Sequence, residues 1–162
     1  PSTVFNADNT IHQGIEASLD WWIVDGPDAR LRLRQTYGWS DFRFDNDPVY
    51  RDNRLPIAPV HQYRASLRYV GQGGLFVEPN IDWRPRSTWA DYRNTMRVPG
   101  YATFGIGAGI DLRGVTLFVD ARNLADKHYV SDQSAAITAT AASAIFHPGE
   151  GRSVTGGVRM RF

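Results

Sequence analysis

The sequence has 162 residues and a formal net charge of +1, so its bulk charge gives no argument for binding nucleic acid. It contains no cysteine, which excludes disulfide frameworks, thiolate metal sites and cysteine nucleophiles. Lys127 is the only lysine, so arginine carries almost all of the positive charge and favours bidentate recognition of carboxylate or phosphate groups.

Apolar and polar residues alternate along most of the chain, which is the pattern of β-strands with one apolar and one polar face. The first two alternating stretches cover residues 14–23 and 30–39, and the segment Asp25–Asp28 between them has the composition of a tight turn. Phe42 and Phe44 then fall on the opposite parity, which predicts a bulge or a membrane boundary near Ser40 and Asp41.

A long polar connection, residues 45–60, contains three prolines and leads to alternating stretches over 62–69 and 75–84. Gly71–Gly74 reads as the tight turn between these two strands. Pro79 lies within the second strand, where it removes one ladder hydrogen bond and predicts a bulge.

A second long polar connection, residues 85–100, precedes two strands over 102–112 and 115–122, which the tight turn Arg113–Gly114 joins. A third long stretch, rich in threonine, alanine and serine, then leads to the final strand at 152–162. No apolar run approaches the ~20 residues that a membrane-spanning helix needs.

Strand length and loop order indicate the fold class. About seven strands of roughly ten residues match transmembrane β-strands. Tight turns and long loops alternate strictly, as in up-and-down outer-membrane barrels with periplasmic turns and extracellular loops. Aromatic residues fall at two levels, with Trp21 and Tyr69 near the turns and Tyr37, Trp39 and Trp83 near the long loops, as interfacial girdles require.

Two interpretations of this pattern are open: antiparallel strands of a transmembrane barrel, or a soluble β-sandwich or small closed β-barrel that serves as a binding module. Seven strands leave two unpaired edges, and a free edge in lipid leaves backbone groups without hydrogen bonds. On the first interpretation, we expect the chain to be a fragment of a larger barrel.

Several segments resemble the C-terminal part of a TonB-dependent outer-membrane receptor of the siderophore-receptor type. His12–Trp21 resembles the family's Gly-Val-Glu strand, and Arg54–His61 resembles its leucine-proline, proline-x-histidine segment. Val98–Phe104 resembles its proline-glycine-tyrosine segment. Val119–Val130 resembles its Asn-Leu-x-Asp-Lys-x-Tyr motif, and it is followed by Pro148–Arg152 and a strand that ends in phenylalanine.

The resemblance implies that residues 1–162 are the C-terminal segment of a 22-stranded, all-β, antiparallel barrel in the bacterial outer membrane, without its plug and earlier strands. It implies energy-dependent uptake of a scarce ligand, commonly a ferric siderophore or haem. The implied partners are the TonB energy-transducing complex, the plug domain of the same chain, the barrel-insertion machinery, lipopolysaccharide and outer-membrane lipid. Phe162 resembles the terminal aromatic residue that serves as an assembly signal.

The sequence predicts no catalytic residues, no cofactor and no metal site. The histidines are scattered at strand ends and in loops without metal-ligand spacing: His12, His61, His128 and His147. The motif Asn123–Asp126 is interpreted as a structural turn in which asparagine and aspartate bond local backbone. Three glycines of one parity predict a smooth inner face against which a plug packs: Gly105, Gly107 and Gly109.

Basic and aromatic residues are interleaved in the second long loop, which makes it the best candidate for ligand binding. Arginine forks bind carboxylate or phosphate groups, and aromatic rings add stacking surface. The predicted ligand is therefore an anionic complex such as a ferric siderophore, and we expect most strand arginines to pair with acidic residues or with the plug. The candidate ligand-binding residues are Arg86, Trp89, Tyr92, Arg93, Arg97 and His147.

Overall fold

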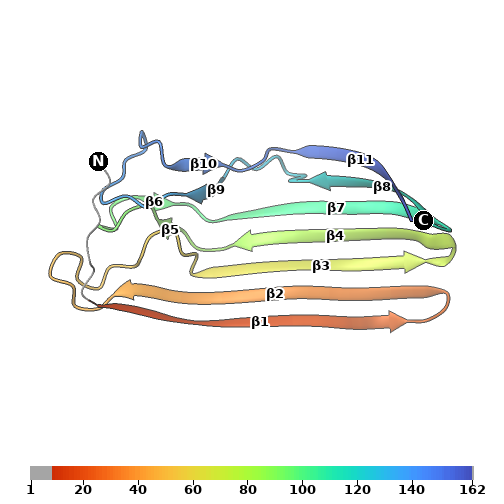
Figure 1. Ribbon diagram of the computed structural model, residues 1–162, viewed down its shortest axis with the longest axis horizontal. Helices are drawn as coiled ribbons and strands as arrows, with labels where there is room; N and C mark the ends of the chain where they lie inside the picture. The colour runs from red at the N-terminus through yellow and green to blue at the C-terminus, as the bar shows by residue number, and fades with distance from the viewer. Residues whose placement is uncertain (1–8, 162) are drawn as a thin grey trace.

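The computed structural model describes residues 9–161, so Phe162, the predicted assembly signal, lies outside the described residues. Seven long strands form one antiparallel sheet in which each strand pairs with the next long strand along the chain (Figure 1). They are β1 (Thr10–Asp25), β2 (Ala29–Phe44), β3 (His61–Gly71), β4 (Leu75–Arg84), β7 (Tyr101–Leu112), β8 (Val115–Arg122) and β11 (Ser153–Met160). The predicted up-and-down order is confirmed.

Tight turns join the strands at one end of the sheet and long connections join them at the other, as predicted (Figure 1). The turn between β7 and β8 consists of Arg113 and Gly114, both with positive φ, which suits a two-residue hairpin turn. The short 3-10 turn η1 (Gln72–Gly74) joins β3 to β4.

The long connections contain paired short strands. In the second connection, β5 (Thr88–Trp89) pairs with β6 (Arg97–Val98). In the third, β9 (Val130–Gln133) pairs with β10 (Phe146–Pro148). Within residues 9–161, no helix is long and apolar enough to cross a membrane.

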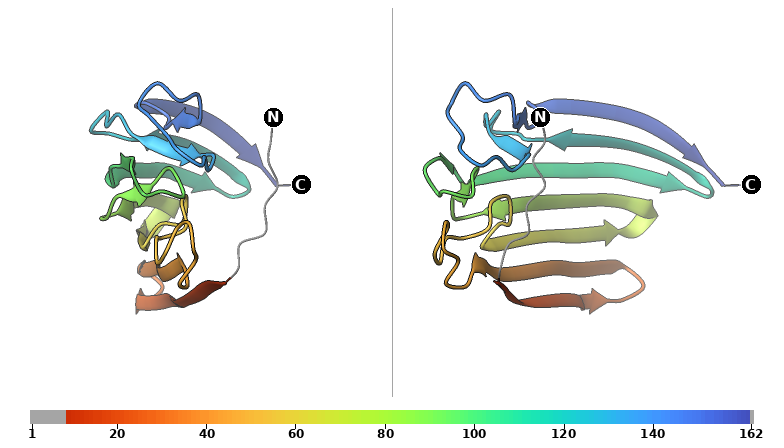
Figure 2. Two further views of the ribbon diagram at one scale, coloured as in Figure 1. Left: turned by 90° about the vertical axis from the view of Figure 1, so that its left-hand side faces the viewer. Right: turned by 60° about the vertical axis from the view of Figure 1, so that its left-hand side comes forward.

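The sheet is a curved wall (Figure 2). Its two faces differ chemically. The polar parity lines a hollow on its inner face. The apolar parity covers the outer face, and its side chains are exposed in the first strand as in the last. The exposed fraction is 60% for Ile15 in β1 and 68% for Val154 in β11. A β-sandwich would bury this face against a second layer, but the described residues provide one large sheet and two short two-stranded pairs. The sandwich interpretation is therefore wrong.

The strand register confirms the two aromatic levels. Tyr37 lies opposite Tyr63, which lies opposite Trp83, so these three rings form one row across β2, β3 and β4 near the long connections. Towards the turns, Trp21 pairs with Leu33, which lies two residues along β2 from Leu31, the partner of Tyr69. The rings of both rows lie on the apolar face.

Neither predicted bulge is present. β1 and β2 keep one register past Ser40, and the only register shift in this pair lies between Trp22 and Val24. Phe44 therefore reaches the inner face through a regular strand, where the first long connection covers it and leaves it 1% exposed. Pro79 stays in register with Ile106, because a missing proline N–H interrupts a ladder without requiring an extra residue.

The compact core lies at the loop end rather than within the sheet. The buried apolar side chains of the described residues are Phe44, Tyr50, Val60, Ala90, Val98, Tyr101 and Ala139. Most of them belong to the three long connections or to the strand ends beside them. Loop packing, and not a second sheet, therefore supplies the apolar core of this part of the molecule.

Candidate functional site

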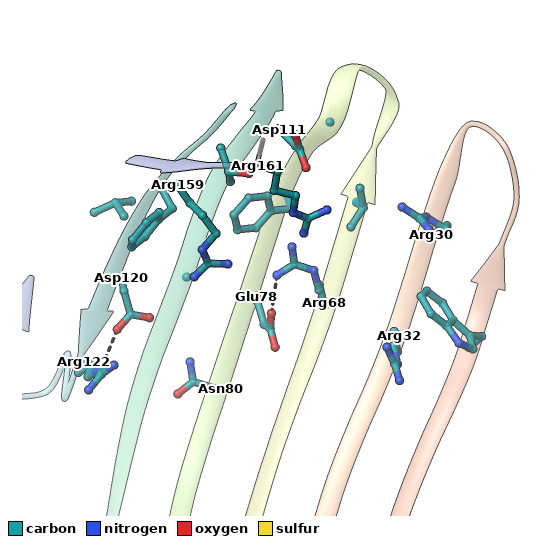
Figure 3. A pocket seen from close by; sticks show the side chains of 18 residues that line it. Arg30, Arg32, Arg68, Glu78, Asn80, Asp111, Asp120, Arg122, Arg159 and Arg161 are labelled. Carbon is teal, nitrogen blue, oxygen red and sulfur yellow. Dashed lines mark hydrogen bonds and ion pairs between the residues drawn. The ribbon is translucent and has the colours of Figure 1, made fainter. Parts of the chain in front are cut away.

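The inner face of the sheet forms a positively charged hollow of about 860 Å³ (Figure 3). Six arginines and three acidic residues line it, which leaves an excess of three positive charges. The arginines are Arg30, Arg32, Arg68, Arg122, Arg159 and Arg161, and the acidic residues are Glu78, Asp111 and Asp120. The hollow is therefore suited to an acidic surface or ligand rather than to an apolar one.

Two phenylalanine rings lie flat on this wall because glycine faces each of them across the ladder. Phe76 pairs with Gly109, where an added Cβ would lie 2.7 Å from the ring. Phe118 pairs with Gly157, where the same atom would lie 2.6 Å from the ring. The predicted smooth inner face is thus wrong at Gly109 and at Gly105, where the β4 side chains of Phe76 and Asn80 respectively lie against the glycine.

Each flat ring carries an arginine on its open side. The guanidinium carbon of Arg68 lies 4.2 Å from the Phe76 ring centre, and that of Arg159 lies 5.7 Å from Phe118. Arg32 lies 4.8 Å from the Trp22 ring in the same way. Attraction to the aromatic face helps to hold each cation over the wall.

Acidic partners neutralise part of this charge. Glu78 bridges Arg68 at 2.8 Å and Arg34 at 3.2 Å. Asp20 accepts two hydrogen bonds from Arg32, at 2.6 and 2.5 Å. Arg64–Asp82 and Arg122–Asp120 are further such pairs. These pairs agree with the expectation that most strand arginines pair with acidic residues or with the plug, as far as the acidic residues of the described chain are concerned.

The uncompensated charge lies towards the turn end of the wall. Within residues 9–161, no acidic side chain forms an ion pair with Arg30, Arg159 or Arg161. Arg30 stands near the start of β2, and the other two stand at the end of the chain. Figure 3 shows Arg159 and Arg161 extending from the last strand into the same hollow.

At the loop end, the first long connection is bonded to the second. Asn53 donates to the Tyr92 carbonyl at 2.9 Å. Asn94 accepts from the Arg54 N–H and donates to the Arg54 carbonyl, both at 2.9 Å. The ring of Tyr92 also contacts Phe44, with centroids 6.0 Å apart.

The second connection is bonded to the third in the same manner. Ala136 donates its N–H to the Ala90 carbonyl and accepts from the Tyr92 N–H, at 3.2 and 3.0 Å. Gln133 donates to the Trp89 carbonyl at 2.9 Å. We call these interlocked connections, residues 45–60, 85–100 and 123–152, the loop cap.

Asp91 is the central residue of the loop cap. Its fully buried carboxylate accepts from the Thr95 N–H at 2.8 Å, from the Ala139 N–H at 3.1 Å and from the Thr95 hydroxyl. Burial by itself raises the pKa of this carboxyl, but these hydrogen bonds outweigh burial and hold the pKa below its usual 3.8. No sequence motif predicted a role for Asp91, although the Asp-x-x-x-Thr spacing allows such a local turn.

The Asn123–Asp126 motif closes the third connection, which confirms its interpretation as a structural turn. Asn123 is 4% exposed, donates to the carbonyls of Lys127 and Glu150, and accepts from the Lys127 N–H. Asp126 accepts from the Arg152 N–H at 2.9 Å, which is the main cause that lowers its pKa. Both ends of a loop of about thirty residues are thereby fixed together.

The structure gives the six candidate ligand residues different environments. Trp89 is half-buried and pairs across β5 and β6 with Arg97, whose guanidinium lies 4.4 Å from the indole centre. Tyr92 packs inside the loop cap. Three arginines and one histidine are exposed: Arg86, Arg93, Arg97 and His147. Of these six residues, Trp89 and Arg97 lie in contact with each other.

The histidines do not gather in the described part of the chain. Within residues 9–161, no group of three or more histidine, aspartate or glutamate side chains is placed to hold a metal ion. His61 instead shares a hydrogen bond of 2.8 Å with the Tyr37 hydroxyl on the outer face.

We predict that Asp91→Asn loosens the loop cap by about 1–3 kcal/mol, because an amide leaves at least one buried donor unsatisfied. Local opening should appear as faster hydrogen exchange at the Thr95 and Ala139 amides. Asp132→Asn, an exposed acid of the same cap, is the matched control. Equal protection in the two variants would contradict the role of Asp91.

The same carboxylate gives a pH prediction. Its folded-state pKa lies below that of the unfolded chain, so its stabilisation is complete above about pH 4 and is lost as the pH falls through the folded-state pKa. Lowering the pH below about 4 should therefore destabilise the loop cap of the wild type more than that of Asp91→Asn. The rate of limited proteolysis within the loop cap, compared above and below this pH, measures the difference.

The chain is similar in sequence and in fold to known receptors. The ferrioxamine receptor of Yersinia enterocolitica is 28% identical over 127 residues, which cover 74% of this chain and 17% of the receptor. The ferric yersiniabactin uptake receptor FyuA of Yersinia pestis superposes with a TM-score of 0.76 at 22% identity, covering 97% of this chain and 24% of that one. The siderophore receptor PiuA of Acinetobacter baumannii gives 0.75 at 22% identity, covering 93% and 22%.

The chain thus spans between a sixth and a quarter of the length of these proteins. The structural similarities establish the fold: the sheet is like a portion of the barrels of these receptors. The family model described as "TonB dependent receptor-like, beta-barrel" matches residues 1–124, more than half of the chain. This chain belongs to the TonB-dependent receptor-like β-barrel family.

Proposed function

We propose that this chain is the C-terminal wall segment of a 22-stranded outer-membrane receptor that takes up a ferric siderophore or a similar anionic iron complex. The family membership carries this proposal. The named relatives support it, since the curated one is a ferrioxamine receptor and the structural ones are siderophore receptors. The two edge strands, β1 and β11, would pair with strands of the complete barrel.

The two faces support a division of roles. The exposed apolar face would contact outer-membrane lipid, and the charged hollow would contact the plug domain of the complete receptor. Arg30, Arg159 and Arg161 would then pair with acidic residues of the plug. The energy-transducing TonB complex would act through the plug rather than through this segment, and Phe162 would serve the insertion machinery as an assembly signal.

The membrane orientation predicts unequal tolerance of charge on neighbouring residues. Leu19 is 44% exposed on the outer face, whereas Ser18 lies on the other parity of the same strand, between Glu16 and Asp20. Leu19→Arg should cost roughly 2–4 kcal/mol in bilayers. Ser18→Arg gains acidic neighbours and should fold normally. Folding of the complete receptor into vesicles measures both, and equal losses would refute the face assignment.

The loop cap should lie outside the cell and the tight turns in the periplasm. Ala142→Cys, in the exposed third connection, should react with a membrane-impermeant thiol reagent on intact cells. Gln72→Cys, in the exposed turn η1, should react only after the cells are opened. The reverse labelling pattern would overturn the orientation.

For ligand binding we propose the exposed side of the β5–β6 hairpin. Arg97 is held over Trp89, and Arg93 lies in the turn between the two short strands. Neither arginine forms an ion pair within the described residues, so both are available to an anionic chelate. Tyr92 and the interlocked backbone would keep this hairpin rigid, which reduces the entropy lost on binding. His147 remains a candidate contact from β10.

Removing both arginines tests this site. Arg93→Ala with Arg97→Ala should weaken binding of an anionic ferric catecholate chelate by about 1.5–3 kcal/mol for each arginine that contacts it. Arg113→Ala, at the opposite end of the sheet, is the control. Titration of the complete receptor in detergent measures the affinities. Unchanged affinity in the double variant would discard this site, and binding of uncharged chelates alone would refute an anionic ligand.

A further inference from the structure

A small cavity lies where the three long connections meet the ends of β4 and β7. Its volume is about 30 Å³, which is room for one or two water molecules and too little for a chelate. Its lining comes from each connection and from both strands, and it includes Ile57, Arg84, Thr88, Val98, Tyr101 and Gln133. The cavity therefore lies at the joint between the wall and the loop cap.

Gln133 contributes a buried acceptor without a partner. The residue is 6% exposed, and its Nε2 donates to the Trp89 carbonyl at 2.9 Å. This hydrogen bond determines the orientation of the amide, because the opposite orientation would bring two carbonyl oxygens together. Oε1 is therefore the atom that remains, and it makes no hydrogen bond within residues 9–161.

Arg84 contributes a buried donor without a partner. Its Nη1 donates to the Ser131 carbonyl at 3.1 Å, and its guanidinium carbon lies 5.2 Å from the centre of the Tyr101 ring. These contacts hold the guanidinium beside β9, yet its Nε makes no hydrogen bond in the part of the chain that the structure describes. One other buried side-chain atom among the described residues lacks a partner, Asp82 Oδ1, and Asp82 does not line the cavity.

The two atoms select the occupant of the cavity. The Nε–H group can only donate a hydrogen bond, and Oε1 can only accept one. A metal cation would face the positive charge of Arg84, and an anion would face the Gln133 oxygen, whereas a water molecule both accepts and donates. Because two buried polar groups without partners cost free energy, a bound water is favoured over an empty cavity.

We infer that a water molecule is bound in this cavity, where it accepts a hydrogen bond from Arg84 Nε and donates one to Gln133 Oε1. It joins the end of β4 to β9. The hydrogen bonds continue from Gln133 to the Trp89 carbonyl, which also accepts from the Ile57 N–H at 3.0 Å. Gln133 is thus a positioning residue for β5, whose indole ring contacts Arg97. This consequence rests on the proposed ligand site, whereas the water site does not.

A crystal structure of the complete receptor, at a resolution that shows ordered waters, tests the site directly. The expected result is one density peak about 2.7–3.2 Å from both Arg84 Nε and Gln133 Oε1. An empty cavity, a peak that contacts only one of the two atoms, or a direct hydrogen bond between them would overturn the inference. The peak should be absent in Gln133→Met, which keeps the length of the side chain and removes its amide. A peak that persists in this variant would count against the site.

Hydrogen exchange at the Ile57 amide measures the bridge in solution. Arg84→Met and Gln133→Met should each speed this exchange about tenfold or more, because each leaves the other polar group buried and unpaired. The double variant should exchange no faster than the faster single variant, since both partners of the water are then apolar. Effects that multiply would identify two independent side chains and overturn the bridge. Ser134→Ala, exposed beside Gln133, is the control and should exchange like the wild type.

Binding of the anionic ferric catecholate chelate separates this inference from the proposed function. Gln133→Met should weaken chelate binding severalfold, because Trp89 and Arg97 lose their support, and Ser134→Ala should leave the affinity unchanged. Unchanged affinity in Gln133→Met would overturn the positioning role of Gln133. A wild type that holds the water and binds no such chelate would reject the proposed ligand and support the water site.

Discussion

Backbone hydrogen bonding in one continuous antiparallel register is the constraint on which this structure depends. A single sheet has no second layer to protect its ladder, so each interior strand must satisfy its N–H and C=O groups through two neighbours. The register from β1 to β11 has one shift, at Trp22 and Val24, and even Pro79 stays within it. Every side chain is thereby assigned to one face, because a slip of one residue would exchange the two faces.

That assignment separates the chemistry of the two faces. Inside, glycine opposite Phe76 and Phe118 lets these rings lie flat and support arginines, so the wall remains cationic despite its ion pairs. Outside, the rows of Tyr37 and Tyr69 bound an apolar band. The loop cap has the only compact core of the described residues, and the buried Asp91 links two of its connections through backbone amides.

Phe44 departs from the apolar face, as its parity predicts, but the cause is that the first connection folds over a regular strand, and no bulge is present. The aromatic and basic residues of the second loop were predicted as one ligand site. The structure gives Tyr92 a packing role and places Arg86 beside the outward-facing rings, so residues close in sequence have different environments.

The sequence by itself determined the seven long strands, their order, their two faces and the position of turns and loops, because these follow from period-2 alternation and from local turn chemistry. It also determined the Asn123 turn, whose hydrogen bonds reach mainly to nearby backbone. It did not indicate the short strands β5, β6, β9 and β10 inside the long connections. Only the tertiary structure decided the burial of Asp91, the rings over Gly109 and Gly157, and the cavity beside Arg84 and Gln133. Each of these depends on side chains from strands or loops far apart in the chain, and no local pattern specifies such contacts.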